Sequence, residues 1–156
     1  MFGDALLLGT PCPVIRKDTW YYLRLRGLFE RGYDMYEICI ETHFSAAHHL
    51  RNYRGKCEFP HGHNWIVEVR VQCKMLDEVG IGIDFADVKK AANEILEHLD
   101  HRDLNQLPQF SQENPTSENI ARHIYRALSG RLNDGTRRVS KVKVCETPGS
   151  GVYYWE

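Results

Sequence analysis

The chain has 156 residues, of which 42% are hydrophobic and 26% are charged, and its formal net charge is −1. This length fits one domain with a substantial core. The nearly neutral charge, without a polybasic block, excludes a bulk electrostatic attraction to nucleic acid or to a membrane surface.

The sequence carries no signal for a membrane or for export. No run approaches the roughly 20 apolar residues that a membrane helix needs, and Asp4 stands where a signal peptide would have positive charge. The five cysteines are irregularly spaced and lack the density of a disulfide framework. We therefore expect a cytoplasmic protein with reduced thiols and with no nucleic-acid or membrane partner.

Residues 1–34 differ in pattern from the rest of the chain. Pro11 and Pro13 precede an aromatic and arginine-rich stretch that lacks a clean period of 2 or 3.6, and the periodic pattern begins at Met35. We expect an N-terminal extension over residues 1–34 and the functional domain over 35–156, with Met35 as the functional start. A helix packed on the domain is the alternative for the extension.

The first half of the domain predicts two strands and a helix. Apolar and polar residues alternate over residues 36–41 and again over about 63–74, which is typical of strands with one buried face. Asp84 can cap a helix that ends near residues 99–105. The apolar residues of this helix recur at three- and four-residue steps: Phe85, Val88, Ala92, Ile95 and Leu99.

The second half predicts a helix followed by two strands. Pro115, Thr116 and Ser117 supply a helix start, and Asn133 begins a turn that ends it. Alternation over residues 138–147 predicts another strand, and a short apolar run over 152–155 predicts the last one. The chain order is therefore strand, strand, helix, helix, strand, strand.

Three histidines form a candidate metal site. His61 and His63 share the core-facing side of the second strand, with alpha carbons two strand steps apart, and His48 has small apolar neighbours on the preceding segment. If the first two strands form a hairpin, the three rings can meet. Three neutral histidines leave the fourth position of a zinc ion open for water or substrate, as in catalytic sites. Taken singly, each histidine is more simply a hydrogen-bonded core or turn residue.

Cys57 is the cysteine with a candidate chemical role. It lies in a polar loop beside Lys56 and near Arg54, and basic neighbours favour the thiolate. Its alternative role is that of a fourth ligand, which would close the metal's shell. The cysteines inside strand patterns are more simply packing residues: Cys39, Cys73 and Cys145.

Two further places carry candidate reactive groups. Asp100 and His101 follow the first helix, where a carboxylate can set the tautomer and basicity of an imidazole, or where the histidine simply complements the helix dipole. Glu146 shares the face of apolar strand residues, and a carboxylate there needs a partner such as the donor groups of a ligand. The other histidines are expected to be structural or solvated, with His123 exposed: His43, His49, His98 and His123.

Six motifs, in this order and at these distances, resemble the 6-pyruvoyltetrahydropterin synthase family: "FSAAHHL", "CEFPHGHNW", "IDFADVK", "LDHRDLN", "NPTSENIA" and "VCETPGSGVYY". The similarity covers about Met35 to Glu156. Within the family it is greatest to the bacterial 6-carboxytetrahydropterin synthases of queuosine biosynthesis. These have three residues between the cysteine and the next histidine, as between Cys57 and His61, whereas the animal pyruvoyl-forming enzymes have more.

The resemblance implies an α+β tunnelling fold (T-fold), in which a four-stranded antiparallel sheet carries two helices on one face. It implies homo-oligomers built through the sheets, usually hexamers made of two trimers, with active sites at subunit interfaces. It implies Zn2+ as the cofactor, held by His48, His61 and His63. The remaining implied roles are those of the proton acceptor Cys57, the relay pair Asp100 and His101, the pterin anchor Glu146, and the pocket residues Thr116 and Ser117.

The reaction that the resemblance implies is a zinc-dependent carbon–carbon lyase reaction. It converts 7,8-dihydroneopterin triphosphate and water to 6-carboxy-5,6,7,8-tetrahydropterin, acetaldehyde and triphosphate. Arg51, Arg54 and Lys56 are candidates to meet the triphosphate, and a solvated basic loop explains them equally well. The alternatives are a 6-pyruvoyltetrahydropterin synthase, which eliminates the triphosphate, and a non-catalytic zinc-binding module.

Overall fold

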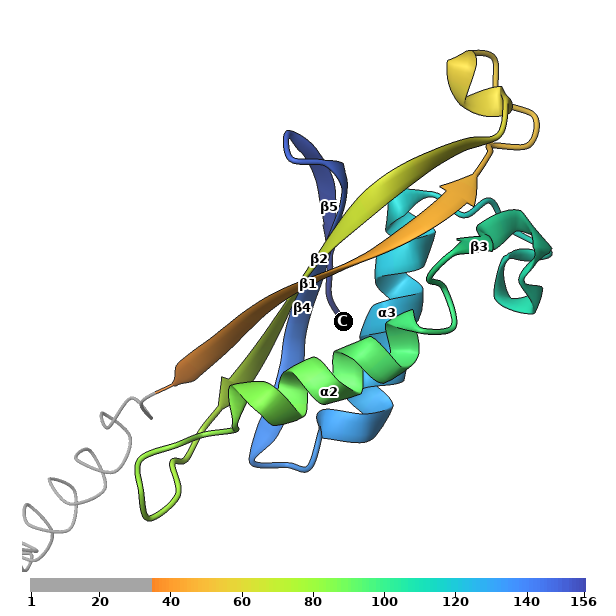
Figure 1. The fold of residues 1–156 in the computed structure, drawn as a ribbon. Helices are drawn as coiled ribbons and strands as arrows, with labels where there is room; N and C mark the ends of the chain where they lie inside the picture. Colours follow the sequence, from red (N-terminus) through yellow and green to blue (C-terminus); the bar gives the residue numbers. More distant parts are fainter. Residues whose placement is uncertain (1–34) are drawn as a thin grey trace, which may run out of the picture. The chain divides into compact units, whose positions relative to one another are not determined.

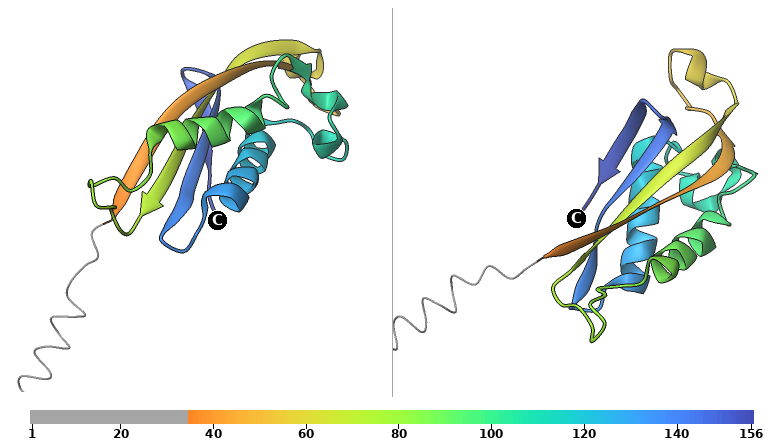
Figure 2. Two further views of the ribbon diagram at one scale, coloured as in Figure 1. Left: turned by 60° about the horizontal axis from the view of Figure 1, so that its bottom comes forward. Right: turned by 60° about the vertical axis from the view of Figure 1, so that its left-hand side comes forward.

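The computed structural model describes residues 35–156, and the expectations for residues 1–34 lie outside this part. One mixed sheet, in the order β3-β1-β2-β4-β5, carries both helices on the same face (Figures 1 and 2). The strands are β1 (Tyr36–His48), β2 (His61–Cys73), β3 (Arg102–Asp103), β4 (Arg137–Thr147) and β5 (Ser150–Tyr154). The helices are α2 (Phe85–Leu96) and α3 (Ser117–Leu132), with short 3-10 turns η1 (Lys56–Glu58), η2 (Leu104–Gln106) and η3 (Pro108–Phe110).

This architecture confirms the predicted α+β fold class. The four longer strands are antiparallel to their neighbours, as expected. The described residues add a fifth strand, β3, which is two residues long and pairs in parallel with Ala46 and Ala47 of β1. Since β3 immediately follows His101, this short pairing fastens the segment after α2 to the end of β1.

The long hairpin of β1 and β2 forms the centre of the sheet. Its register places Tyr36 opposite Cys73 at one end and His48 opposite His61 at the other. β1 is longer than the predicted strand over 36–41, because its alternation continues inward through Phe44 and Ala46. The hairpin curves beyond the helices, and η1 lies in its connecting loop (Figure 1).

The core lies between the sheet and the two helices. Trp65, Val67, Val69 and Val71 of β2 are fully buried, as the alternation predicted. Burying each valine contributes about 1.5–3 kcal/mol relative to exposure. The helices supply the opposite wall with residues that include Val88, Ala92, Ile95, Ile120, Ile124 and Leu128.

One predicted core residue of α2 is exposed. Asp84 caps the helix by accepting a hydrogen bond from the Ala86 amide at 2.7 Å. Phe85, the first residue after the cap, is 58% exposed, so its place in the apolar stripe was wrong. The first helical position points away from the sheet here, and the buried face begins at Val88.

The cysteines of the strands differ in burial. Cys73 and Cys145 are buried, as expected for packing residues, whereas Cys39 is exposed, which corrects its assignment. Cys39 alternates with the inward-facing Ile38 and Ile40 and therefore lies on the helix-free face.

Within the described part of the chain, no helix is long and apolar enough to cross a membrane.

The β4–β5 hairpin contains a close backbone approach beside the candidate residue Glu146. The register shifts between Cys145 and Thr147, so Glu146 lies at an irregularity of the ladder. At Gly151 an added Cβ would lie 2.4 Å from the Cys145 sulfur and 2.9 Å from the Val144 carbonyl oxygen. The hairpin therefore requires glycine at this position.

We expect Gly151→Ala to lower the free energy of unfolding by about 1–3 kcal/mol, because backbone atoms must move to admit the methyl group. Chemical denaturation measures this loss. Gly149→Ala in the same turn is the control, since its Cβ meets nothing within 4 Å and should change stability by less than about 0.5 kcal/mol. Equal effects of the two substitutions would contradict this account.

Candidate metal and catalytic centre

The hairpin brings the three predicted histidines together. His48 ends β1, His61 begins β2 opposite it, and His63 faces Ala46 two pairs further along. One ring nitrogen from each of the three lies within 4.8 Å of the others. The ring centroids of His48 and His61 are 4.5 Å apart, and those of His61 and His63 are 4.9 Å apart.

Backbone carbonyls select the tautomer of two of these rings. His48 Nδ1 lies 2.8 Å from the Pro115 carbonyl oxygen, and His61 Nδ1 lies 2.8 Å from that of Phe59. A carbonyl oxygen only accepts, so both Nδ1 atoms carry the proton and both Nε2 atoms keep a free lone pair. Partners of this kind orient the histidine ligands of metal sites.

Burial favours the neutral form of two of these histidines, His48 and His63. His48 is 1% exposed, and burial lowers its pKa despite the opposing hydrogen bond to Pro115. Burial also lowers the pKa of His63, against the nearby carboxylate of Glu146. Neutral imidazole is the form that binds a metal.

Two buried ring atoms support a metal as the missing partner. The Nε2 atoms of His48 and His63 have no hydrogen-bond partner in the structure, although buried polar groups are nearly always satisfied. Trp65 closes the inner side, with its ring 4.9 Å from that of His48 and 5.2 Å from that of His63. Three imidazoles with free lone pairs fit zinc, and they leave a fourth position for another ligand.

Cys57 does not belong to this three-histidine cluster. It lies in η1, between the two strands that carry the histidines, and is partly buried. Its carbonyl oxygen accepts a hydrogen bond from the Leu50 amide at 2.8 Å, which ties η1 back to the segment that follows His48. This backbone hydrogen bond keeps Cys57 near the segments that carry the histidines, although its thiol is not part of the cluster.

Asp100 and His101 form a fixed pair at the edge of β1. Asp100 Oδ1 accepts from the Ser45 amide at 2.8 Å, and Asp100 Oδ2 contacts His101 Nδ1 at 2.8 Å. His101 has a left-handed backbone, with φ of 53°, and its amide donates to the Ser45 carbonyl at 2.6 Å. The imidazole side chain is 81% exposed, so its Nε2 is open to a substrate or to another molecule.

An open hollow of about 550 Å3 has both His63 and His101 in its lining. His101 is not part of the three-histidine cluster itself. Its orientation by Asp100 matches the arrangement that leaves one imidazole nitrogen free to exchange protons.

Glu146 and the start of α3 also lie near the cluster. Ser117, which is buried, donates through its hydroxyl to Glu146 Oε1 at 3.1 Å. Thr116 caps α3 by accepting from the Asn119 amide at 3.3 Å, so its hydroxyl has a structural use. Glu146 therefore has one side-chain partner and remains only partly buried, as a group that receives a ligand's donors would be.

Several residues of the site were not foreseen from the sequence. Pro115 and Phe59 act through their carbonyls, which no side-chain pattern reveals. Arg51, a triphosphate candidate, instead directs its guanidinium to the segment over residues 110–114. His123, expected to be exposed, is partly buried against the ring of Phe110, and burial lowers its pKa.

Asp100 predicts a pH-dependent contribution to stability. The hydrogen bond from the Ser45 amide, followed by the contact with His101, lowers the pKa of Asp100 in the folded protein. A lowered folded pKa stabilises the protein above the unfolded value of about 3.9 and is lost as the pH falls through the folded pKa. We expect Asp100→Asn to destabilise the protein at pH 7 but to approach the parent at pH 3.

Urea denaturation of the metal-free proteins at both pH values measures this difference. The control is Glu78→Gln, which removes an exposed carboxylate elsewhere on the surface and should match the parent at both pH values. A deficit of Asp100→Asn that is as large at pH 3 as at pH 7 would refute the assignment.

Comparisons with known proteins identify the family of the chain. Residues 37–156 match the family model described as 6-pyruvoyl tetrahydropterin synthase. A Rickettsia felis protein named 6-carboxy-5,6,7,8-tetrahydropterin synthase is 30% identical over 67% of this chain and 89% of its own. The human 6-pyruvoyl tetrahydrobiopterin synthase is 37% identical over 76% of this chain and 90% of its own.

The fold is also shared with solved structures. The 6-pyruvoyl tetrahydropterin synthase of Caenorhabditis elegans superimposes with a TM-score of 0.69 and 27% identity, covering 79% of this chain and 96% of that one. The family model and the human relative each extend over most of the chain. The chain therefore belongs to the 6-pyruvoyl tetrahydropterin synthase family.

Proposed function

We propose that the protein is a zinc-dependent 6-carboxytetrahydropterin synthase that acts on 7,8-dihydroneopterin triphosphate. The products are 6-carboxy-5,6,7,8-tetrahydropterin, acetaldehyde and triphosphate, and the reaction serves queuosine biosynthesis. The observation that carries the proposal is the cluster of His48, His61 and His63, whose free ring nitrogens lie beside a carboxylate suited to a pterin.

In this proposal Glu146 anchors the pterin ring. A carboxylate accepts two parallel hydrogen bonds from neighbouring N–H donors, and the pterin's amino group and ring nitrogen present such a pair. The hydroxyl of Ser117 holds one carboxylate oxygen, which restricts the rotation of the Glu146 side chain. The anchored ring then extends its side chain toward the histidine cluster.

Zinc, when held by the three histidines, would acidify the positions next to the side-chain hydroxyls of the substrate. Cys57 is the base that removes a carbon-bound proton, a role left open to it because its thiol stands outside the ligand set. His101 passes protons through its free Nε2 while Asp100 holds Nδ1. These are the roles that the resemblance of the sequence motifs implies.

The exposure of His101 supports an active site completed by a second subunit. The pair lies at the edge of β1, where an imidazole with 81% of its surface open has one ordered partner, Asp100. We propose a homo-oligomer, a hexamer made of two trimers, in which the pair faces a neighbouring cluster. A cytoplasmic location and a catalytic domain over residues 35–156 belong to the same proposal, and the family match that begins at residue 37 supports that boundary.

The choice of product depends on the connection between the strands. Three residues separate Cys57 from His61, as in the carboxy-forming enzymes that the chain resembles. Relatives named for the carboxy product and relatives named for the pyruvoyl product both match the chain. A 6-pyruvoyltetrahydropterin synthase is therefore the second candidate, with the same site and a different product.

Substitution of Cys57 separates an enzyme from a zinc-binding module. We expect Cys57→Ala to retain about one zinc ion per chain, because three histidines hold it, and to lose turnover by about 10²–10⁴-fold through loss of the base. Metal analysis and a steady-state assay measure the two effects. His63→Ala should lose the zinc, and His98→Ala, which replaces an exposed histidine in the turn after α2, should lose neither zinc nor turnover. Loss of zinc and of folding in Cys57→Ala would favour the structural module.

Product analysis decides the reaction. We expect the zinc-loaded protein, incubated with 7,8-dihydroneopterin triphosphate, to release acetaldehyde and triphosphate in equal amounts, because the carboxy-forming reaction cleaves the side chain. The chelator-treated protein is the control and should release neither. Triphosphate without acetaldehyde would identify the pyruvoyl-forming activity instead.

A further inference from the structure

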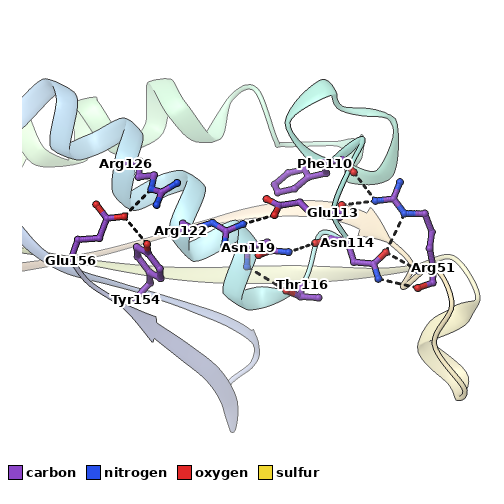
Figure 3. A network of polar contacts seen from close by, with 10 residues as sticks. All are labelled: Arg51, Phe110, Glu113, Asn114, Thr116, Asn119, Arg122, Arg126, Tyr154 and Glu156. Carbon is purple, nitrogen blue, oxygen red and sulfur yellow. Dashed lines mark hydrogen bonds and ion pairs between the residues drawn. The ribbon is translucent and has the colours of Figure 1, made fainter.

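Arg51 binds the chain segment that precedes α3. Its Nη2 donates to the carbonyl oxygens of Phe110 and Glu113, and its Nη1 lies 3.4 Å from that of Ser111. Its Nε donates to Asn114 Oδ1 at 3.1 Å (Figure 3). Four of the five N–H donors of a guanidinium are therefore used within the protein.

Asn114 completes the attachment from the opposite side. Its Oδ1 accepts from the Arg51 amide at 2.8 Å, and its Nδ2 donates to the Arg51 carbonyl at 3.0 Å. One side chain thus pairs with both backbone groups of Arg51, as a neighbouring strand would. The Asn114 carbonyl is fixed in turn by the Thr116 amide and the Asn119 side chain, each at 2.8 Å.

These contacts form a closed ring with the metal ligand. His48 precedes Arg51 by three residues, and Pro115 directly follows Asn114. The Pro115 carbonyl accepts from His48 Nδ1, so the ring runs from His48 along the chain to Arg51, across to Asn114, and back through Pro115. The position of that carbonyl depends on the attachment of the segment over 110–114, which has irregular structure around η3.

We propose that Arg51 is a positioning residue for the metal site. Through Asn114 and the carbonyls of residues 110–113, it holds the Pro115 carbonyl where His48 must carry its proton on Nδ1 and present Nε2 to the metal. The proposal rests on the zinc site proposed above. It also excludes Arg51 as a triphosphate ligand, because its donors are already engaged.

Arg51→Lys tests the proposal, because lysine keeps the charge but cannot reach four acceptors in the guanidinium's planar arrangement. We expect the zinc Kd, measured by competition with a chromogenic chelator, to rise about 10–100-fold, the usual effect of removing a residue that orients a ligand. The matched control is Arg54→Lys, an exposed arginine with no hydrogen bond among the described residues, whose Kd should equal the parent's.

A second readout separates positioning from general stabilisation. Nitrogen-15 NMR of the zinc-free protein distinguishes protonated from unprotonated ring nitrogens. We expect His48 to carry its proton on Nδ1 in the parent and in Arg54→Lys, and to populate both tautomers in Arg51→Lys. Asn114→Ala, which removes the pairing with the Arg51 backbone, should shift Kd and tautomer in the same direction, and it carries the test if Arg51→Lys does not fold.

An unchanged Kd and an unchanged His48 tautomer, together with a lower melting temperature, would overturn the proposal and leave Arg51 a purely stabilising role. Failure of the parent protein to bind zinc would be a different result. It would refute the proposed function and would be visible before any variant is compared.

Discussion

The pairing of His48 with His61 across β1 and β2 determines where every inward-facing side chain of the hairpin lies. A slip of one residue would turn each strand over, because side chains alternate between the two faces. The valines of β2 oppose such a slip, since it would bring them into water. The hydrophobic core at one end of the hairpin therefore enforces the convergence of three polar rings at the other.

The same burial that stabilises the fold prepares the histidines for a metal. Exclusion of water favours neutral imidazoles at His48 and His63, and it leaves two ring nitrogens without partners. An unsatisfied buried polar group costs about 1–3 kcal/mol, a penalty that a bound cation would remove. The paired strands thus hold the three rings in position, and a bound metal would supply the missing partner of the ring nitrogens.

Features that depend on the local alternation of residues could be predicted from the sequence where that alternation is clear. Alternation located β2, and the spacing of His61 and His63 placed both rings on its inner face, because these are local properties of a strand. β1 was predicted too short, since Ala46 and His48 are weak hydrophobic signals at its inward positions. The exposure of Cys39 was missed for a related reason, because a cysteine in a strand is equally compatible with either face.

Longer-range contacts were beyond sequence reasoning. The partner of His48 is a backbone carbonyl 67 residues away, and a carbonyl is present at every position of the chain. Arg51 appeared to be a solvated or phosphate-binding residue, because its true acceptors are also carbonyls supplied by an irregular segment. Only the three-dimensional path of the chain around η3 shows why that arginine is not free.

Cys57 lies in η1, within the loop that joins the two paired strands of the hairpin. The position of its thiol is therefore set separately from the positions of the three histidines. Residues 49–60 lie outside the β1–β2 register, which ends at His48 and resumes at His61. An insertion or deletion within residues 52–58 repositions the thiol without shifting a strand pair, and it leaves Arg51 and Phe59, which contact the supports of the histidines, on their own sides of the change. Relatives can therefore diverge in how they treat a bound substrate through changes in loop length alone, while the ligand set and the core remain as they are.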